Sequence, residues 1–586
     1  MKGKETRMSI DPKAIAEARK EWEERSVAPA LKRFKLVENP SRFYTPLDLP
    51  DFDFIEKVGF PGQYPFTAGT YAFLPYQAGL KGTGFIPQSP ELVRAGRYSG
   101  YGAPEDYRDY QIHMQSLGAR SGPNIAFDLP TQLGYDSDSP MAEGEVGRAG
   151  VAVSTLRDFE VIYEAFTAER DIDRIASNFT INAPANMIIA MYVALAEKRG
   201  IPVETLRATP QNDILKEFVG RGAYIFPPGP SMRMMRDSIV FITRRLPSFN
   251  ITSIGGYHMR EAGATREQDL AFSMAIGAAY LHEGVNAGLD IDSFAPRFSF
   301  NVFGGSMEFY KEIAFQRAAR RMWASLLKER FGAKEPRSLL LRQPLAAHIG
   351  CISTTLQRPL NNLIRTVVGG MASAMSGGPP ESWPPYDEPL GLGWSLEAIQ
   401  LAEDAQRILQ HEAKLCDVID PFAGSYFMES LTDEIEEAGW TEFEKIQTMG
   451  GVVTAIESGY MQQEVAKSAY ERQKRIESGE DLVVGVNCFT GEHELDVRTT
   501  RLVPHPYDPE KMELAESKQI ANLREVKKTR DNQAVIRLLK DLEVAAKKET
   551  ENLIPRLIEC VTAYATIQEM CDVLRGVFGK YQETNI

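Results

Sequence analysis

Short apolar runs alternate with longer amphipathic stretches between about residue 85 and residue 400. The runs have the length of β-strands and include NIAFDLP (124–130), RIASNFTINA (174–183), NITSIGGYH (250–258) and RFSFNVF (297–303). The stretches between them, such as 186–200 and 267–284, have the length and period of helices. Strands that alternate with helices predict βαβ units and a parallel sheet. The length of this α/β pattern favours a closed (β/α)8 TIM barrel over an open sheet.

A helix and an arm precede the predicted barrel. Residues 11–35 predict a helix with charged faces, which Asp11 caps and which has Pro12 in its first turn. The passage 43–71 that follows is rich in proline and in aromatic residues. We interpret it as an extended arm that packs on the barrel or on a partner.

Helical patterns dominate the part of the chain beyond the barrel. One helix is predicted at 396–415, and amphipathic helices run from about residue 510 to the end. Between them, LVVGVNCF (482–489) predicts a strand. We therefore expect three parts, which are the helix and arm at 1–60, an acyl-CoA-binding barrel at 61–400 by the resemblance described below, and a mostly helical region at 401–586.

The predicted strands carry small polar residues, whereas the interior of a barrel is usually filled by branched aliphatic side chains. They are Ser177, Asn178, Thr180, Asn182, Thr252, Ser253, Ser299 and Asn301. These residues fit an interior that admits a polar ligand. They fit equally well at strand ends that face the loops, and their positions alone leave both interpretations open.

Composition excludes several classes of protein. The hydrophobic content of 43% and the charged content of 25% are those of a soluble globular protein. The net charge of −14 argues against bulk binding to nucleic acid or to a membrane surface. The chain shows no signal peptide and no apolar run of membrane-spanning length. Its five cysteines are scattered without a C-x-x-C pair, which fits a reducing cytoplasm and gives no zinc site.

Residues able to take part in catalysis gather between Gln211 and His258. This stretch offers the amide of Gln211, the guanidinium of Arg221, the phenol of Tyr257 and the imidazole of His258. Polar residues at the carboxyl end of a barrel strand are typical of catalysis. A lone histidine is more often a hydrogen-bonded structural residue, and spacing alone favours a surface ion pair for Arg221. The neighbouring polar residues shift the balance towards a functional site.

Two further motifs have both a functional and a structural interpretation. Arg297 begins a predicted strand, where it lines the barrel or forms a buried salt bridge with Asp290 or Asp292. The acidic stretch FDLPTQLGYDSD (127–138) resembles a weak divalent-cation loop, but its spacing is not that of an EF-hand. We favour turn and capping roles for it and predict no metal site within this chain. Spacing and composition together indicate a barrel enzyme with a polar site around 211–258.

Several motifs spread over most of the chain from about residue 60 identify a family. They are TAGTY (67–71), YSGYGAPED (98–106), AFDLPTQLGYDSD (126–138), GEVGRAGVAV (144–153), QNDILKEF (211–218), IFPPGPSMR (225–233), GGYHMREAGA (255–264), LDIDSFAPRFSF (289–300) and DPFAGSYFMESLT (420–432). With them the chain closely resembles the large, catalytic subunit of adenosylcobalamin-dependent acyl-CoA mutases, the methylmalonyl-CoA mutase family.

The resemblance implies a (β/α)8 barrel through which coenzyme A threads. It also implies a radical rearrangement in which the cofactor adenosylcobalamin, an organocobalt compound, supplies the radical. In the family, a flavodoxin-like domain with an Asp-x-His-x-x-Gly loop binds the cobalamin, and this sequence contains no such loop. A separate small subunit is therefore the expected cobalamin-binding partner, in a heterodimer or heterotetramer, and a GTPase chaperone is a further partner that the resemblance allows.

The resemblance also assigns roles to individual residues. His258, Gln211, Tyr257 and Tyr98 match catalytic residues of the family, of which His258 hydrogen-bonds the thioester carbonyl and Tyr98 helps to drive the adenosyl group off cobalt. Arg221 matches the residue that pairs with the free carboxylate of the substrate. Arg297, Tyr71 and Thr67 match the family's substrate-binding segments.

Arg221 and Tyr98 favour a carboxylated acyl-CoA of the succinyl-CoA and methylmalonyl-CoA type. Relatives that act on isobutyryl-type substrates have Gln at the first of these positions and Phe or Ile at the second. The sequence departs from the family in the added LKGTGFIPQSPE between Tyr71 and Tyr98 and in GGPPESWPP (377–385). These departures suggest a bulkier alkyl or aryl substituent on the substrate. The alternatives are an isobutyryl-CoA or 2-hydroxyisobutyryl-CoA mutase, and a non-catalytic acyl-CoA-binding barrel that scaffolds a cobalamin protein.

Overall fold

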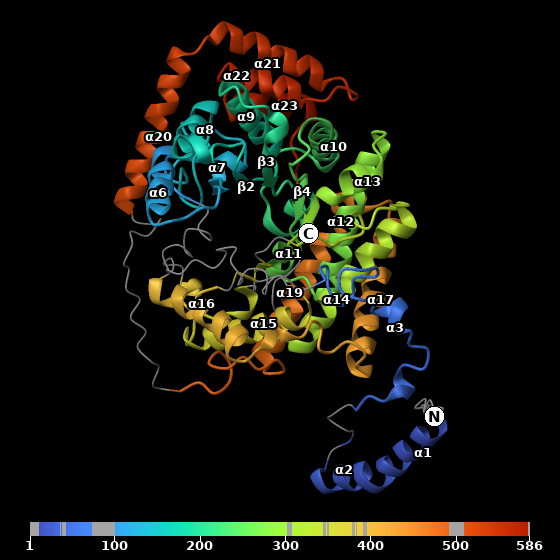
Figure 1. Ribbon diagram of the computed structural model, residues 1–586. Helices are drawn as coiled ribbons and strands as arrows, with labels where there is room; N and C mark the ends of the chain where they lie inside the picture. The colour runs from blue at the N-terminus through green and yellow to red at the C-terminus, as the bar shows by residue number, and fades with distance from the viewer. Residues whose placement is uncertain are drawn as a thin grey trace, which may run out of the picture.

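The chain folds as a mostly helical α/β protein with short parallel strands (Figure 1). The computed structural model describes residues 11–35, 37, 43–72, 100–301, 307–343, 347–348, 351–377, 381–382, 384–390, 395–491 and 509–583. Tyr98, the inserted LKGTGFIPQSPE and part of GGPPESWPP lie outside these residues.

The strands form three parallel sheets. They are β1 (Asn124–Ala126), β2 (Ala176–Thr180), β3 (Arg207–Pro210), β4 (Thr252–Ile254), β5 (Phe298–Phe300), β6 (Ala347–His348) and β7 (Glu381–Ser382). The pairing is β1-β2-β3, β4-β5 and β6-β7, with β2 in register so that Asn178 lies opposite Asn124 on one side and Thr209 on the other. Strands therefore pair with their neighbours in the sequence, as the alternating pattern predicts.

Backbone hydrogen bonds join the first two sheets into one run of parallel neighbours. The amide of Asn250 donates to the carbonyl of Ala208 at 2.8 Å, and this bond places β4 beside β3. The amide of Phe300 donates to the carbonyl of Arg342 at 2.7 Å, which adds the segment 341–343 beside β5. On the other side, Val151 pairs with the segment that follows β1.

Helices occupy most of the remaining chain. In the first half they are α1 (Pro12–Trp22), η1 (Glu23–Val27), α2 (Ala28–Phe34), η2 (Pro46–Asp48), α3 (Phe54–Lys57), α6 (Pro104–Ser116), α7 (Leu129–Gln132), η3 (Pro140–Ala142), α8 (Leu156–Ile162), η4 (Tyr163–Ala165), η5 (Ala168–Arg170), α9 (Ala185–Lys198), η6 (Val203–Thr205), η7 (Glu217–Arg221), α10 (Pro228–Arg245), α11 (Gly256–Ala262), α12 (Arg266–Asn286), α13 (Ile291–Phe294) and η8 (Ala295–Arg297). In the second half they are α14 (Phe309–Ser325), η9 (Leu326–Arg330), η10 (Cys351–Ser353), α15 (Asn361–Met375), η11 (Glu388–Leu390), α16 (Leu396–His411), η12 (Leu415–Asp417), α17 (Tyr426–Thr448), α18 (Val452–Glu457), α19 (Tyr460–Ser478), α20 (Pro509–Thr529), α21 (Asn532–Ala546), α22 (Ile554–Thr562) and α23 (Ile567–Phe578).

One face of the sheet packs on helices and the other stays accessible. In β2, Ser177 and Phe179 are buried, whereas Ala176 and Asn178 are exposed and Thr180 is half-buried. The Ser177 hydroxyl hydrogen-bonds the hydroxyls of Tyr163 and Tyr192, so this residue faces the helices and not the interior. Successive side chains of a strand point to opposite faces. The polar residues of β2 therefore divide into Ser177, which faces the helices, and Asn178 and Thr180, which lie on the accessible face.

A polar line crosses the accessible face. Arg342 donates to Asn250 Oδ1 at 3.1 Å, and Asn250 Nδ2 donates to Thr209 Oγ1 at 2.7 Å. All three side chains are half-buried. Central strands of a parallel sheet are usually buried and hydrophobic on both faces. This face is therefore built to meet something polar.

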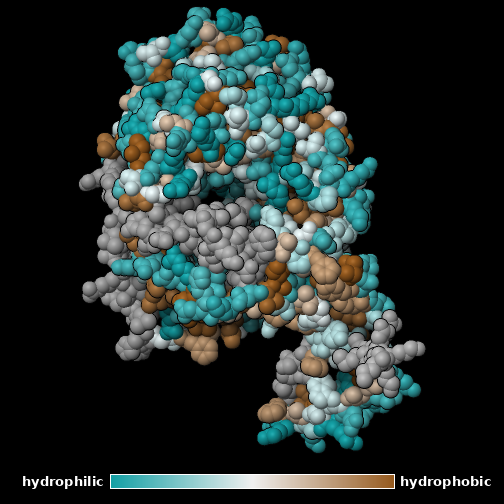
Figure 2. All heavy atoms as spheres, viewed as in Figure 1, coloured by the Kyte–Doolittle hydropathy of each residue, from teal (hydrophilic) through white to brown (hydrophobic). Residues whose placement is uncertain are grey.

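The N-terminal helices stand apart from the body of the chain (Figure 1), and Figure 2 shows them as a separate protrusion with hydrophilic and hydrophobic patches. Asp11 caps α1 by accepting from the amides of Lys13 and Ala14, as the sequence predicts. Neither α1 nor α2 has a buried residue. The arm that follows does pack on the body, since Arg320 donates to the carbonyls of Phe66 and Thr67.

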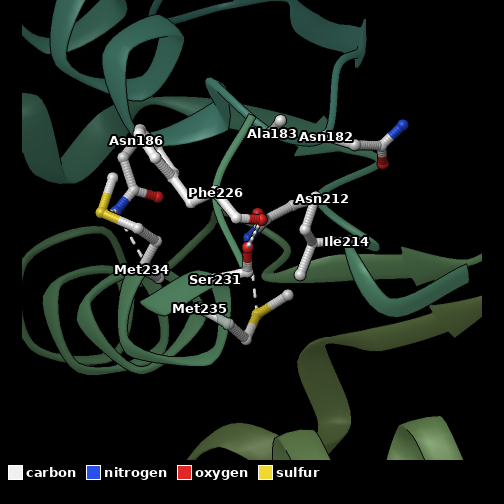
Figure 3. A pocket seen from close by; sticks show the side chains of 9 residues that line it. All are labelled: Asn182, Ala183, Asn186, Asn212, Ile214, Phe226, Ser231, Met234 and Met235. Carbon is white, nitrogen blue, oxygen red and sulfur yellow. Dashed lines mark hydrogen bonds between the residues drawn. The ribbon is translucent and has the colours of Figure 1, made fainter. Parts of the chain in front are cut away.

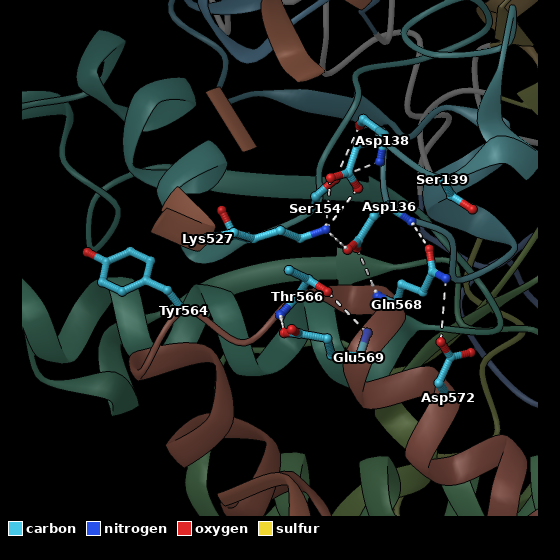
Figure 4. Close-up of polar contacts among 12 residues, drawn as sticks. Asp136, Asp138, Ser139, Ser154, Lys527, Tyr564, Thr566, Gln568, Glu569 and Asp572 are labelled. Carbon is cyan, nitrogen blue, oxygen red and sulfur yellow. Dashed lines mark hydrogen bonds and ion pairs between the residues drawn. The ribbon is translucent and has the colours of Figure 1, made fainter. Parts of the chain in front are cut away.

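The C-terminal helices cover the outside of the sheet layer, where α22 packs along α9 (Figure 1). Figure 4 shows how α20 and α23 hold the acidic stretch 127–138. Lys527 of α20 forms ion pairs with Asp136 at 3.0 Å and Asp138 at 2.8 Å, and Gln568 exchanges two hydrogen bonds with Asp136. Asp128 caps α7. Asp128 thus has the capping role that we favoured for this stretch, whereas the ion pairs of Asp136 and Asp138 with Lys527 were not predicted.

The predicted strand at 482–489 is wrong. Its residues turn back on themselves, because the amide of Gly485 donates to the carbonyl of Cys488 and only an isolated bridge joins Val484 to Cys488. Gly485 has φ of +81°, a left-handed conformation that interrupts an extended strand. Among the described residues, no helix is both long and apolar enough to cross a membrane.

Candidate functional site

The site lies beyond the carboxyl ends of β3 and β4, which are adjacent in the sheet. Gln211 directly follows β3 and is buried, with 7% of its surface exposed. Tyr257 and His258 lie in the first turn of α11, two residues after β4 ends. The sequence correctly predicts a short strand that ends in two glycines and then presents these side chains.

A left-handed turn at Asn212 sets the direction of the chain at the end of β3. Asn212 has φ of +43°, which asparagine tolerates better than most residues. Its side chain donates to the carbonyl of Ile251 at 3.1 Å, and the hydroxyl of Thr252 donates to the carbonyls of Gln211 and Asn212. These contacts fasten the turn to β4 and so fix the position of Gln211.

The orientation of the Gln211 amide follows from its partners. Gln211 Oε1 accepts from Asn182 Nδ2 at 2.8 Å and from Lys216 Nζ at 3.3 Å. Because its oxygen is occupied, the amide NH2 group is the side that meets the Tyr257 hydroxyl, with which Gln211 forms a hydrogen bond. Gln211 therefore presents a donor towards Tyr257.

Glu217 contacts both cations of the site, Lys216 and Arg221. It begins the π-helical turn η7, and its side chain is fully buried. Glu217 Oε1 contacts Lys216 and accepts from Asn182 Nδ2 at 2.6 Å and from Arg221 Nη1 at 3.2 Å. The amide of Ala223 donates to Glu217 Oε2 at 3.0 Å. The Arg221 side chain is 30% exposed, so this guanidinium is anchored at one end and accessible at the other.

Asp213 and Lys216 form a second, deeper layer. Asp213 accepts from the amide of Gly255 at 2.7 Å and from the hydroxyl of Tyr280 at 2.7 Å. Burial raises the pKa of Asp213 to about 6, against the effect of the Lys216 charge. Burial also lowers the pKa of Lys216, while the charges of Glu217 and Asp213 oppose this shift. The bond to Gly255 fixes the turn from which Tyr257 and His258 project.

The rings of Tyr257 and His258 lie together, with centroids 4.0 Å apart. Burial raises the pKa of Tyr257 to about 12, although the charge of Arg221 and the hydrogen bond with Gln211 act in the opposite direction. The phenol therefore stays protonated at neutral pH. A Cβ atom at Gly220 would lie 3.0 Å from the carbonyl of His258, so glycine lets η7 approach α11 closely. At this close approach, the charge of Arg221 acts on the phenol of Tyr257.

A small cavity of about 10 Å³ lies behind the site and has room for about one water molecule (Figure 3). Its lining residues are Asn182, Ala183, Asn186, Asn212, Ile214, Phe226, Ser231, Met234 and Met235. Figure 3 shows the Asn182 amide directed away from this cavity. The cavity thus backs the turn at Asn212 and does not hold the candidate catalytic groups.

The remaining predicted residues lie elsewhere. Arg297, the residue directly before β5, donates to the carbonyls of Ile242 and Leu246 at 3.1 and 3.2 Å. In the described part of the chain, Arg297 forms no ion pair with Asp290 or Asp292, so this suggested pair is wrong. The Asp292 carboxylate instead accepts from the backbone amides of Lys334 and Glu335.

Tyr71 and Thr67 lie in the arm. Tyr71 is 44% exposed and interacts electrostatically with Arg342 of the polar line. Thr67 is fully buried and donates to the carbonyl of Lys57 at 2.7 Å. Tyr98 lies outside the described residues. The structure therefore brings together Gln211, Arg221, Tyr257 and His258 from the predicted set.

Sequence reasoning missed the residues that support these four. Asp213, Lys216 and Glu217 lie within QNDILKEF, and their charges are fully buried. The sequence did contain a signal for them, because this short motif places three charged residues among apolar residues that must themselves be buried. Among the described residues, no group of three or more His, Cys, Asp or Glu side chains could hold a metal ion.

Comparison with known proteins defines the class. A family model described as methylmalonyl-CoA mutase matches residues 38–580. The 2-hydroxyisobutanoyl-CoA mutase large subunit of Aquincola tertiaricarbonis is 37% identical over 586 residues, which cover 97% of each chain. A probable mitochondrial methylmalonyl-CoA mutase of Caenorhabditis elegans is 38% identical over 91% of this chain and 68% of the relative. The methylmalonyl-CoA mutase of Escherichia coli is 36% identical over 86% and 70%.

These matches show that the chain is an isomerase of the cobalamin-dependent acyl-CoA mutase class. Within that class, the chain belongs to the methylmalonyl-CoA mutase family. The resemblance drawn from the sequence motifs is thereby confirmed, and membership implies the use of adenosylcobalamin.

Proposed function

We propose that this chain is the substrate-binding, catalytic subunit of a mutase that rearranges the carbon skeleton of a carboxylated acyl-CoA. The observation that carries the proposal is the meeting of Gln211, Tyr257, His258 and Arg221 beyond two adjacent strand ends. Three of these side chains offer hydrogen-bonding groups, and the fourth offers an accessible cation. This set suits a thioester carbonyl next to a free carboxylate.

Each residue has a distinct task in this proposal. His258 and the donor side of Gln211 bind the thioester carbonyl and hold the acyl group in one orientation. Tyr257 packs against the acyl group and excludes water from it. Arg221 pairs with the substrate carboxylate, and loss of one partner of such an ion pair in a dry site costs about 2 to 5 kcal/mol. An acyl-CoA without a carboxylate cannot form this pair, so Arg221 favours carboxylated over uncharged substrates.

A cofactor bound at the same edge of the sheet would lie beside Tyr257 and His258. Tyr257 and His258 are half-buried in the first turn of α11, so their exposed sides face outward from the strand ends. Adenosylcobalamin, when bound there, supplies the radical that starts the rearrangement. A relative of matching length is named a large subunit, which supports a separate small cobalamin-binding subunit as the partner. A heterodimer or heterotetramer, serviced by a GTPase chaperone in a reducing cytoplasm, completes the proposal.

The proposal includes a closed (β/α)8 barrel at 61–400, preceded by the helix and arm and followed by the helical region 401–586. The run of parallel neighbours from Val151 to Arg342 supports it. The accessible line of Thr209, Asn250 and Arg342 supports a passage for a polar chain such as pantetheine. Arg297 and Tyr71 are proposed to contact the same ligand, and Thr67 to hold the arm that carries Tyr71.

A second substrate class is 2-hydroxyisobutyryl-CoA, because a relative that matches 97% of this chain is named 2-hydroxyisobutanoyl-CoA mutase large subunit. Arg221 distinguishes the two classes, since an uncharged hydroxyacyl group has no carboxylate to pair with it. A bulkier alkyl- or aryl-substituted succinyl-CoA remains within the first class.

The test is to purify the chain gently from its source cells and to assay what accompanies it. We expect a cobalamin spectrum, a small partner with an Asp-x-His-x-x-Gly loop, and turnover of succinyl-CoA or a substituted derivative. Turnover of 2-hydroxyisobutyryl-CoA alone would favour the second class. A chain that stays free of corrinoid and inactive after adenosylcobalamin is added would favour the non-catalytic scaffold.

A further inference from the structure

A fully buried lysine lies directly beneath the site. Lys216 has no exposed surface, its ammonium contacts Glu217, and it donates to Gln211 Oε1 at 3.3 Å. A buried ammonium has an effective desolvation penalty of several kcal/mol, so a lysine here requires these partners. The proposed reaction uses Gln211 and Arg221 but gives Lys216 no task.

The geometry excludes direct contact between Lys216 and a substrate. Its ammonium is enclosed by Gln211 and Glu217, and its side chain lies against Gly255, where a Cβ atom would be 3.4 Å from Lys216 Cε. Lys216 can act only through the groups that it touches. Those groups are the oxygen of Gln211 and the carboxylate of Glu217.

The charges around Glu217 suggest what that action is. Two carboxylates, of Asp213 and Glu217, meet two cations, of Lys216 and Arg221. Glu217 Oε1 contacts both cations, so Lys216 carries part of the compensation for its charge. Without Lys216, Arg221 would compensate Glu217 alone and would have less positive potential to offer at its exposed end.

We propose that Lys216 is a positioning residue that holds Gln211 with its amide NH2 towards the substrate and balances Glu217, so that Arg221 stays available to a substrate carboxylate. This inference rests on the proposed function, because it concerns carboxylate binding at Arg221. Asn182 shares the first task, since it also donates to Gln211 Oε1. Burial lowers the pKa of Lys216, and the charges of Glu217 and Asp213 oppose this shift.

The experiment measures binding of two ligands that differ only in the carboxylate. The dissociation constants of succinyl-CoA and butyryl-CoA are determined by calorimetry for the full chain and for Lys216→Met, Glu217→Gln and the double variant. The ratio of the two constants isolates the carboxylate, because the thioester contacts are common to both ligands. Thermal unfolding and circular dichroism report whether each variant is folded.

We expect the wild-type chain to prefer succinyl-CoA and Lys216→Met to lose that preference by about tenfold. The double variant should recover it, because removal of Glu217's charge makes the lost cation unnecessary. Glu217→Gln alone should increase the preference above wild type. Lys216→Met should also weaken butyryl-CoA, since Gln211 is then held by Asn182 alone.

The outcomes separate this inference from the function on which it rests. A wild-type chain without preference for succinyl-CoA overturns the proposed function itself. A wild-type preference that stays unchanged in folded Lys216→Met overturns the positioning role, as does a double variant in which the preference is lost further. If Lys216→Met does not fold, Glu217→Gln decides, and an unchanged or lower preference in that variant overturns the inference.

Discussion

Asn182 donates a side-chain hydrogen bond to Gln211 Oε1 at 2.8 Å, although the two residues are 29 positions apart and follow neighbouring strands. The same amide nitrogen reaches Glu217 Oε1 at 2.6 Å, and Asn182 Oδ1 accepts from the amide of Asp213 at 2.9 Å. One asparagine thus links the group that binds the thioester to the group that anchors Arg221.

Asn182→Ala should impair catalysis more than stability. Loss of the amide leaves Gln211 Oε1 with Lys216 alone, so the Gln211 amide can rotate and withdraw its donor. We expect kcat/KM for the acyl-CoA substrate to fall by about 10- to 100-fold and the free energy of unfolding to fall by about 1 to 3 kcal/mol. Steady-state kinetics and chemical denaturation measure the two effects.

Asn186→Ala is the matched control. Asn186 lines the same small cavity and is equally buried, but it donates to the carbonyl of Met234 and accepts from Ser238. The Asn186→Ala variant should lose a similar amount of its free energy of unfolding and keep most of its kcat/KM. Equal kinetic losses in the two variants would contradict the special role of Asn182.

His258→Ala should lower kcat steeply and leave acyl-CoA binding largely intact. The imidazole is assigned to the thioester carbonyl, whereas most of the ligand binds elsewhere. A loss of about 100-fold or more in kcat is expected for a group used in the transition state. His282→Ala is the control, because His282 packs on Phe331 away from the site. Full turnover by His258→Ala would move the chain towards the non-catalytic scaffold.

Arg221→Gln should change the preferred substrate. The variant loses the ion pair with the substrate carboxylate, so kcat/KM for a succinyl-type ligand should fall by about 100-fold or more. Turnover or binding of an uncharged acyl-CoA should fall much less. Arg244→Gln, at an exposed position in the last turn of α10, should change neither value. Equal losses for both ligands would indicate that Arg221 supports the fold and does not select the substrate.

Lys527→Met should loosen the C-terminal helices. The variant leaves the buried Asp136 without the ammonium that pairs with it and with Asp138 (Figure 4). We expect the free energy of unfolding to fall by about 1 to 3 kcal/mol and proteolysis within 509–583 to become faster. Lys528→Met removes an exposed lysine that pairs with Glu525 on the helix surface, and it should have little effect. Equal protease resistance in both variants would show that the ion pairs of Lys527 do not hold the C-terminal helices in place.

Asp269 should make stability depend on pH. Burial raises the pKa of Asp269 to about 7, and its Oδ2 accepts no hydrogen bond from the described residues. The folded chain therefore keeps this proton at pH values where the unfolded chain has lost it. Its contribution to the free energy of unfolding falls as the pH rises from about 4 to about 7.

Asp269→Asn removes this titration and keeps the shape of the side chain. The free energy of unfolding of the variant relative to wild type should increase by about 2 kcal/mol between about pH 5 and about pH 8. Parallel denaturation curves at several pH values measure the difference. A difference that stays constant with pH would show that Asp269 does not titrate in this range.

The sequence determined the elements whose signals are local. The period of apolar residues gave α9 and α12 almost to their ends, and Asp11 with Pro12 gave the start of α1. The glycine pair after β4 gave the place of Tyr257 and His258. Each of these features depends on a few consecutive residues, so hydrophobic periodicity and capping are enough to predict it.

Only the tertiary structure decided which polar groups meet. It turned Ser177 towards Tyr163 and Tyr192 and directed Arg297 to backbone carbonyls. It also placed Lys216 and Glu217 beneath Gln211. The partner of a buried polar group is chosen by distance in space, because any partner that restores its lost hydrogen bonds is sufficient. Sequence patterns predict that such a group needs a partner, and the packing of distant segments determines which one it receives.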